Sequence, residues 1–508
     1  MTKKEQEVLS SFIEEFAEKI LDGKASLFVG SGFSRPANLP NWKELLEKFA
    51  KEINLEIDKE EHNLISLAQY YVNAKKRPKL NDEIRNRFSY SKMPSSVVLP
   101  NHDLLAALPI KNIWTTNYDQ LLEETLKKHN IIPICLTDDS TIGKINSKNG
   151  VVIHKIHGDA DTPEKCVITK ADYDLYTSTH EMLLAKLKAE MCYNTFLFLG
   201  YSFNDTNIQH ILSRIRAIFG DSKKQRKDLA SPNRHYCIFA KNANKYDNQR
   251  QRHHIDDLKS YGIYPILIDS FEQITDVLKR IRNRVCKKNV FVSGSYPDEL
   301  LVDEKEIVHN AATAIATSLI VSNYSIYSGY GKNLGVDIVQ GAHDGYFLSQ
   351  QDGSKIFDVK IGMNSIVDSA TPKEVKELAW LNNHLFIFPF PFNKNYNSDN
   401  ERAQQYEKWR KLIIEKTQVT ILISGKKIDS NNNVVDADGV YDEFKISDAQ
   451  GNLIIPIEFT GGMAKSIWNE LSKRDSEYYK SALFQKLKDP NAINGTINKI
   501  IEKYALNI

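Results

Sequence analysis

Short apolar runs that end in small or polar residues recur along the first half of the chain. Four of them have the length of a buried strand and span residues 26–29, 112–114, 151–153 and 195–199. Two further runs, 235–240 and 264–268, follow the same pattern. Segments of helical spacing separate the runs, and this alternation predicts an α/β fold with a mostly parallel, doubly wound sheet and helices on both faces.

The pattern begins again after residue 288, with apolar runs at 290–292, 326–327, 385–388, 419–423 and 453–459. We therefore expect two Rossmann-like domains, 1–286 and 288–508, each with a mostly parallel sheet. Residues 344–380 lack clear periodicity, which is typical of an insertion or a flap.

Helical spacing is clearest near the N-terminus. Residues 5–21 carry one apolar stripe, which either packs inside the domain or forms a subunit contact. Asn41, with Glu44 three residues later, predicts a capped helix start. Residues 60–110 are expected to be mostly helical.

Composition narrows the class of protein. The chain has 508 residues, of which 41% are hydrophobic and 26% charged, as expected for a globular protein of several domains. A net charge of +2 gives no reason to expect a nucleic-acid or membrane partner. The five cysteines are widely spaced and never paired as Cys-x-x-Cys, which predicts reduced thiols, a cytoplasmic protein and no bound metal.

The polar segments after the four strands are 30–34, 115–119, 155–159 and 200–205. In a parallel sheet the carboxyl ends of the strands share one edge, so these segments are expected to line one crevice. Asn117 offers a donor and an acceptor on one planar group, and His157 can exchange a proton near neutral pH. Taken singly, a helix-capping Asn, a structural His and a plain turn at Gly30 remain alternatives.

Together these segments resemble the sirtuin-like NAD-binding domain, in the bacterial branch that lacks a zinc module. The motifs are GSGFS at 30–34, TTNYD at 115–119, IHGD at 156–159 and GYSFND at 200–205. The second half is similar to a SLOG domain, a nucleotide-sensing Rossmann-like fold. This pairing resembles the NAD-cleaving effectors of Thoeris antiphage defence.

The resemblance implies an NAD+ hydrolase that uses NAD+ as substrate, with Asn117 and His157 as catalytic residues. It also implies NAD contacts from Gly30, Ser31, Gly32, Ser34, Thr116, Asp119, Gly200, Ser202 and Asp205. Deacetylating sirtuins carry an acidic-aromatic-basic triplet after the loop, where this chain has Pro40, Asn41 and Trp42. An NAD-dependent protein deacylase and a non-catalytic nucleotide sensor remain the alternatives.

The resemblance also implies activation by a cyclic ADP-ribose-type nucleotide, made by a TIR-domain partner, and a homotetramer or larger homo-oligomer. The expected signal-binding residues are Ser293, Gly294, Ser295, Gly329, Tyr330, Gly331, Arg410 and Glu443. The family often has an arginine before a Pro-aromatic-Pro turn, whereas this chain has Phe388 there. The identity or the pose of the signal nucleotide is therefore expected to differ.

Overall fold

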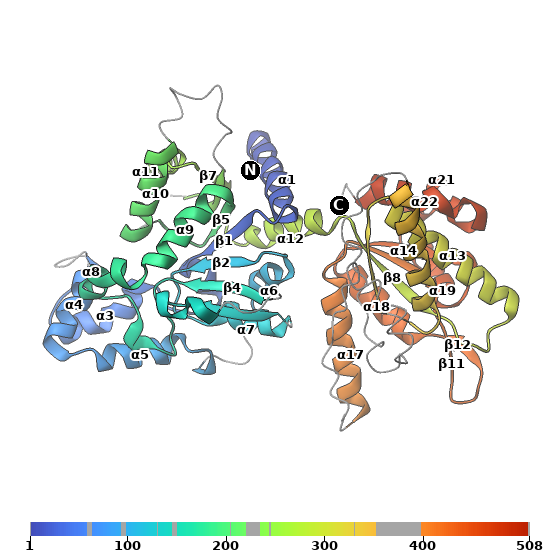
Figure 1. Ribbon diagram of the computed structural model, residues 1–508, viewed down its shortest axis with the longest axis horizontal. Coiled ribbons are helices and arrows are strands. Elements are labelled where there is room, and N and C mark those ends of the chain that lie inside the picture. The colour runs from blue at the N-terminus through green and yellow to red at the C-terminus, as the bar shows by residue number, and fades with distance from the viewer. Residues whose placement is uncertain are drawn as a thin grey trace. The chain divides into compact units, whose positions relative to one another are not determined.

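The computed structural model describes residues 2–57, 63–92, 98–129, 131–144, 150–203, 205–219, 234–242, 245–329, 331–351 and 398–505. The described residues form two compact units, Met1–Val285 and Cys286–Ile508 (Figure 1). Each unit is a parallel sheet flanked by helices, which confirms the predicted fold class.

The sheet of the first unit has, within the described residues, seven parallel strands in the order β3-β4-β2-β1-β5-β6-β7. They are β1 (Ala25–Val29), β2 (Asn112–Thr115), β3 (Ile132–Leu136), β4 (Gly150–Lys155), β5 (Thr195–Leu199), β6 (His235–Ala240) and β7 (Ile263–Ile268). The chain leaves β1 towards β2 on one side and returns to β5 on the other. The strand order therefore reverses between β1 and β5, where a crevice is expected at the carboxyl ends.

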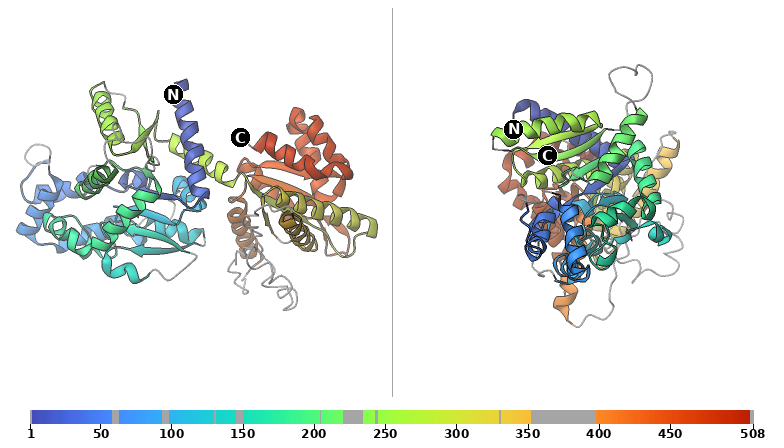
Figure 2. Two further views of the ribbon diagram at one scale, coloured as in Figure 1. Left: turned by 45° about the horizontal axis from the view of Figure 1, so that its top comes forward. Right: turned by 90° about the vertical axis from the view of Figure 1, so that its left-hand side faces the viewer.

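Helices cover both faces of this sheet (Figures 1 and 2). Leu27 and Val29 pack against one layer of helices, and Phe28, between them, packs against the other, because successive side chains of a strand point to opposite faces. The first layer contains α1 (Lys3–Leu21), α6 (Pro100–Ala107), α7 (Leu121–Lys128) and α12 (Gln273–Cys286). The second contains α8 (Lys170–Thr179), α9 (Glu181–Tyr193), α10 (Thr206–Phe219) and α11 (Lys245–Ser260).

A helical module with its own core follows β1. It contains α2 (Ser31–Ser34), α3 (Trp42–Glu52), α4 (Leu64–Lys75) and α5 (Pro78–Phe88). The predicted cap of α3 is confirmed: Glu44 N donates to Asn41 Oδ1, and Asn41 N donates to Glu44 Oε2, both at 2.9 Å. Short 3-10 helices in the first unit are η1 (Arg35–Ala37), η2 (Tyr90–Lys92), η3 (Asp139–Lys144) and η4 (Pro163–Lys165).

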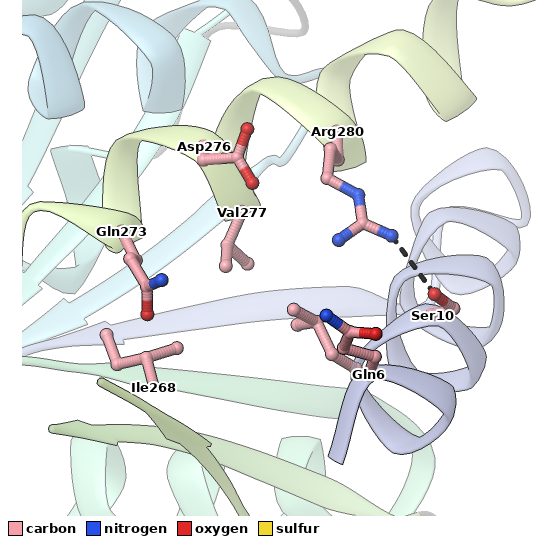
Figure 3. A pocket seen from close by; sticks show the side chains of 8 residues that line it. Gln6, Ser10, Ile268, Gln273, Asp276, Val277 and Arg280 are labelled. Carbon is pink, nitrogen blue, oxygen red and sulfur yellow. Dashed lines mark hydrogen bonds between the residues drawn. The ribbon is translucent and has the colours of Figure 1, made fainter. Parts of the chain in front are cut away.

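The apolar stripe of α1 packs inside the first unit. Phe12, Phe16 and Ile20 are buried, so the structure favours intramolecular packing of the stripe over a subunit contact. Beside α1 lies α12, where Arg280 Nη2 donates to Ser10 Oγ at 3.1 Å (Figure 3). A pocket of about 380 Å³ opens there, and it includes none of the predicted site residues. Its lining is Gln6, Leu9, Ser10, Ile268, Gln273, Asp276, Val277 and Arg280.

The described part of the second unit contains a four-stranded parallel sheet in the order β13-β10-β8-β9. Its strands are β8 (Asn289–Ser295), β9 (Ser325–Ser328), β10 (Val419–Ser424) and β13 (Leu453–Ile457); β11 (Lys426–Ile428) and β12 (Val434–Asp436) form an antiparallel hairpin. The helices are α13 (Val302–Val321), α14 (Leu334–Gln351), α17 (Asp399–Ile414), α18 (Asp438–Ala449), α19 (Gly462–Arg474), α20 (Ser476–Tyr479), α21 (Ala482–Gln485) and α22 (Ile493–Ile500). Shorter turns are η6 (Glu458–Thr460), η7 (Lys486–Lys488), η8 (Pro490–Ala492) and the π-helical η9 (Ile501–Ala505).

One sequence prediction in this unit is wrong for part of its range. Residues 344–351 continue α14, whereas we expected an insertion or a flap to begin at residue 344; Tyr346 is partly buried and packs on the main core of the unit. Residues 352–380, the strand expected at 385–388 and Phe388 lie outside the described residues. Within the described parts of the chain, no helix has the length and apolar character of a membrane span.

Candidate functional site

The two glycine segments after β1 and β5 touch through their backbones. Gly30 N donates to Leu199 O at 2.9 Å, and Gly32 N donates to Gly200 O at 3.0 Å. A Cβ added to Gly30 would lie 2.5 Å from Gly200 O, and Gly200 itself has φ +61°. Glycine is therefore required here for the close approach of two protein backbones. These two N–H groups are already used within the fold, while Ser31 and Gly32 are exposed at the strand edge.

Asn117 is buried where β2 ends. Its backbone N donates to Thr115 Oγ1 at 3.0 Å, and Thr115 Oγ1 donates to Val29 O at 2.8 Å, so the turn is tied to β1. The Asn117 side chain donates from Nδ2 to Ser34 Oγ at 3.1 Å. Its other polar atom, Oδ1, is buried and has no hydrogen-bond partner among the described residues. A buried acceptor without a partner costs free energy, so a ligand donor at this point would be stabilising.

His157 follows β4 and is 3% exposed. Its Nε2 lies 3.0 Å from Asp205 Oδ2, and Asp205 also accepts a hydrogen bond from the Tyr173 hydroxyl at 3.2 Å. The rings of Trp42, Tyr173 and Tyr176 surround the imidazole, with centroids 5.8–6.4 Å away. Burial alone would raise the pKa of Asp205, but the neighbouring imidazole and hydrogen bonds outweigh it and hold this pKa below its ordinary value.

Lys155 lies beneath this edge with a fully buried ammonium group. Its Nζ donates to Asp119 O at 2.6 Å and to Tyr118 O at 3.2 Å, and it pairs with Glu123 at 2.7 Å and with Asp159 at 2.6 Å. Burial opposes its charge, but the two carboxylates outweigh burial and raise the pKa of Lys155. One cation therefore ties the segment after β2 to the segment after β4.

The other predicted residues of the first unit lie along the same strand edge. Thr116 is half-buried and Ser202 is exposed. Asp119 is buried, and its Oδ1 accepts a hydrogen bond from Leu121 N at 3.2 Å, at the start of α7. Tyr173 and Trp42 were not predicted as neighbours of the site, and Lys155 was predicted only as part of the polar segment 155–159, without a role of its own. A lysine at the end of an apolar strand was the available signal for Lys155, whereas nothing in the local pattern distinguishes Tyr173 or Trp42.

In the second unit, Ser293, Arg410 and Glu443 meet at the carboxyl edge of the smaller sheet. Ser293 Oγ donates to Glu443 Oε2 at 2.5 Å, and Arg410 Nε lies 3.5 Å from Glu443 Oε1. Arg410 Nη1 also donates to Asp442 Oδ2 at 3.2 Å. Burial raises the pKa of Glu443 despite the guanidinium beside it. Lys411, the next residue on the same helix, is exposed and pairs with Glu407 at 2.6 Å.

Close backbone contacts also define this second edge. A Cβ on Gly331 would lie 2.0 Å from Gly294 O, and a Cβ on Gly294 would lie 2.0 Å from Ile423 O. A Cβ on Gly329 would lie 3.4 Å from both Glu443 Oε1 and the Trp409 ring. The Oγ of Ser295 donates to Lys426 O at 3.1 Å. Tyr330 lies outside the described residues.

Candidate metal ligands are sparse. Among the residues that the structure describes, no group of three or more His, Cys, Asp and Glu side chains has the geometry to hold a metal ion. All five cysteines are described, and none of them forms a disulfide bond. The absence of a bound metal therefore stays a prediction.

Comparison with known families assigns both units. Residues 111–266 match the family described as SIR2-like domain. Residues 273–356 and 351–506 match the Sir2- and TIR-associating SLOG family. The first match covers β2 to β6 and most of β7 but not β1, and the second match covers every described strand of the smaller sheet.

Curated relatives extend the similarity to almost the whole chain. The NAD(+) hydrolase ThsA of Bacillus cereus (strain MSX-D12) is 31% identical over 516 residues, covering 97% of this chain and 98% of the relative. The NAD(+) hydrolase ThsA of Acinetobacter baumannii (strain 532279) is 32% identical over 511 residues, covering 96% of each. Defense-associated sirtuin 2 of Bacillus subtilis is 26% identical over 216 residues, or 41% of this chain and 21% of the relative. With a SIR2-like and a SLOG unit and this near-complete coverage at 31–32% identity, the chain belongs to the ThsA family of Thoeris defence effectors.

Proposed function

We propose that this protein hydrolyses NAD+ to nicotinamide and ADP-ribose, and that it depletes NAD+ in antiphage defence. Near full-length similarity to relatives named NAD(+) hydrolase supports the activity. The observation that carries the proposal is the edge of the larger sheet, where the buried, unpartnered Oδ1 of Asn117 shares one edge with the His157–Asp205 pair. The catalytic domain is assigned to residues 1–286.

The chemistry of the glycosidic bond fits these groups. Nicotinamide leaves as a neutral molecule, so the main barrier is to form an oxocarbenium-like ribose and bring water to it. Asn117, fixed through Nδ2 by Ser34, keeps Oδ1 as an acceptor for a ribose hydroxyl or for the water. His157 can take a proton from either group, a role worth about 10²–10⁴-fold in rate.

The remaining proposed NAD contacts come from the same edge. The exposed Ser31 and Gly32 are assigned to the phosphates and ribose, as are Gly30 and Ser34. Thr116, Asp119, Gly200 and Ser202 complete the proposed contacts, and Asp205 is a further contact that the sequence predicts. Because Gly30 N and Gly32 N already donate to backbone carbonyls, the phosphate contacts must come mainly from other donors.

We also propose that residues 288–508 sense a cyclic ADP-ribose-type nucleotide that switches the enzyme on. The match to a Sir2- and TIR-associating SLOG family supports this role and a TIR-domain partner as the source of the signal. Ser293, Gly294, Ser295, Gly329, Tyr330, Gly331, Arg410 and Glu443 form the proposed signal site. A second site acts on the first by favouring one arrangement of domains or subunits, in a cytoplasmic homotetramer or larger homo-oligomer.

Product analysis with the purified full chain tests the activity. NAD+ is incubated with the protein, with and without cyclic ADP-ribose isomers, and with and without an acyl-lysine peptide. Equimolar nicotinamide and ADP-ribose without peptide is the expected result. Nicotinamide that forms only with the peptide would indicate a protein deacylase instead. If NAD+ is not cleaved under any condition, the protein would be a non-catalytic nucleotide sensor.

A further inference from the structure

The Asp205 carboxylate contacts the side chains of His157 and Tyr173 and the first residues of α10. We propose that Asp205 is a positioning residue, which fixes the orientation and the protonated nitrogen of His157 and binds no part of the nucleotide. This inference rests on the proposed NAD+ hydrolysis. It explains why a carboxylate, and not only a helix-capping group, stands at this position.

One oxygen of Asp205 is committed to helix α10. Oδ1 accepts hydrogen bonds from Asn207 N at 2.9 Å and from Ile208 N at 3.0 Å, and Gln209 N donates to Asp205 O at 3.0 Å. These are the bonds of a helix N-cap, which fix the carboxylate by one of its oxygens. The second oxygen is therefore held in a defined direction.

That second oxygen faces His157. Oδ2 lies 3.0 Å from His157 Nε2 and accepts the hydroxyl hydrogen of Tyr173 at 3.2 Å. The two side chains are nearly buried, with 3% of His157 and 8% of Asp205 exposed. Burial, together with the Asp205 carboxylate, raises the pKa of Tyr173, so its hydroxyl remains a donor at neutral pH. His157 Nε2 and the Tyr173 hydroxyl therefore lie against the same oxygen of Asp205.

The charge of Asp205 decides which nitrogen of His157 carries the proton. Its lowered pKa keeps Asp205 ionised at neutral pH, and an ionised carboxylate can only accept. If His157 acts as a base, its remaining proton is then on Nε2, beside the carboxylate, and Nδ1 takes the proton from the ribose hydroxyl or the water. The Nε2–H direction in this state is too oblique for an aligned hydrogen bond, and alignment is expected to improve when substrate binds.

Kinetics of Asp205→Asn test this role. Asn retains an oxygen for the α10 cap but replaces the accepting oxygen beside His157 with a donor or a neutral group. We expect kcat to fall by about 10²–10⁴-fold while KM for NAD+ changes by less than about threefold. Asp205→Ser, which also retains a cap, should behave alike. A raised KM with unchanged kcat would overturn the proposal, because that split indicates a nucleotide contact.

Tyr173→Phe is the matched control for the shared oxygen. It removes one donor and leaves the carboxylate, so we expect a kcat loss of about tenfold or less. A loss as large as that of Asp205→Asn would contradict the assignment, because the hydroxyl rather than the carboxylate would then control His157.

A spectroscopic measurement on the wild-type chain serves if the variants do not fold. With ¹⁵N-labelled histidine, the signal missing from His157→Gln identifies His157, and we expect its proton on Nε2. A proton on Nδ1 would overturn the proposal. If wild-type protein cleaves no NAD+ under any condition, the proposed function fails; if it cleaves NAD+ and Asp205→Asn equals wild type, only the positioning role fails.

Discussion

The edge of the larger sheet and the edge of the smaller sheet use polar groups in opposite ways. At the first, Ser34 holds Asn117 by a hydrogen bond, Asp205 lies 3.0 Å from His157 Nε2, and Asn117 keeps a buried acceptor without a partner. At the second, the Arg410 guanidinium is shared between Asp442 and Glu443. An anionic ligand at the second edge must compete with carboxylates of the protein, whereas a ligand at the first edge fills an unmet hydrogen bond.

This difference suits the proposed division of labour. A catalytic edge benefits from groups fixed before the substrate arrives, because no reorganisation is then needed during the reaction. A sensing edge benefits from internal pairs that a ligand can replace, because their replacement is what distinguishes the two states. Substitutions at each edge can break or sharpen the comparison.

The largest effect is expected at the catalytic pair. Asn117→Ala and His157→Ala should each lower nicotinamide release by about 10²–10⁴-fold or more, with the fold retained by circular dichroism. His154→Gln is the matched control. His154 lies on β4, three residues before His157, and its ring stacks on the Trp114 ring with 3.8 Å between the centroids. The His154→Gln protein should be less stable than wild type but keep its kcat. Near-wild-type turnover by a folded His157→Ala protein would refute the catalytic role of His157.

Lys155→Met should destabilise the first unit by about 3–5 kcal/mol, because it leaves the buried Glu123 and the partly buried Asp159 without their cation. Denaturant unfolding measures this loss. Lys51→Met is the control, since the pair of Lys51 with Glu47 is 72% and 57% exposed and should matter by about 0.5 kcal/mol or less. A Lys155→Met protein within 1 kcal/mol of wild type, roughly the scale of a surface pair, would disprove the buried cluster as a tie between β2 and β4.

Arg410→Ala tests the sensing edge. It removes the cation available to a phosphate, so the half-activating nucleotide concentration should rise by about 10- to 100-fold, equivalent to one charge-assisted hydrogen bond. The rate at saturating nucleotide should stay unchanged, because Arg410 is not part of the catalytic edge. An unaltered activation curve would remove Arg410 from the signal site. Glu443→Ala should weaken activation in the same direction.

The smallest effect is expected for Asp442→Asn. Asp442 is 46% exposed and competes with the ligand for Arg410, so its neutralisation should lower the half-activating concentration by up to about fivefold. Lys411→Met is the control, because Lys411 pairs with Glu407 in solvent and should leave activation unchanged. A rise in the half-activating concentration of Asp442→Asn would mean that Asp442 supports Arg410 instead of competing with the ligand.

The sequence predicts the strands that form a clear apolar run before a polar segment, and it misses the strands that lack this pattern. β1, β2, β4 and β5 were expected because each is a short apolar run before a polar segment. β3 was missed because it is partly exposed at the sheet edge and contains Pro133, which breaks the pattern of a central strand. The hairpin of β11 and β12 was missed because three residues are too few for a period to show.

The site was predictable to the level of residues but not of partners. Strand ends in a parallel sheet share an edge, so Asn117 and His157 could be grouped without coordinates. Their contacts join residues far apart in the sequence, such as Ser34 to Asn117 and His157 to Asp205, and depend on helix packing that no local pattern encodes. For the same reason the contact of the Asp205 carboxylate with His157 was not predicted.

The central claim, chemistry at one edge and control at the other, is tested most directly by nicotinamide release from the full chain across a titration of cyclic ADP-ribose isomers. Wild-type protein, His157→Ala and Arg410→Ala are compared at one NAD+ concentration. We expect one isomer to activate wild type, His157→Ala to stay inactive at every concentration, and Arg410→Ala to reach the wild-type rate only at higher concentration. Activation of Arg410→Ala at the wild-type concentration, or nicotinamide release by His157→Ala, would contradict this account.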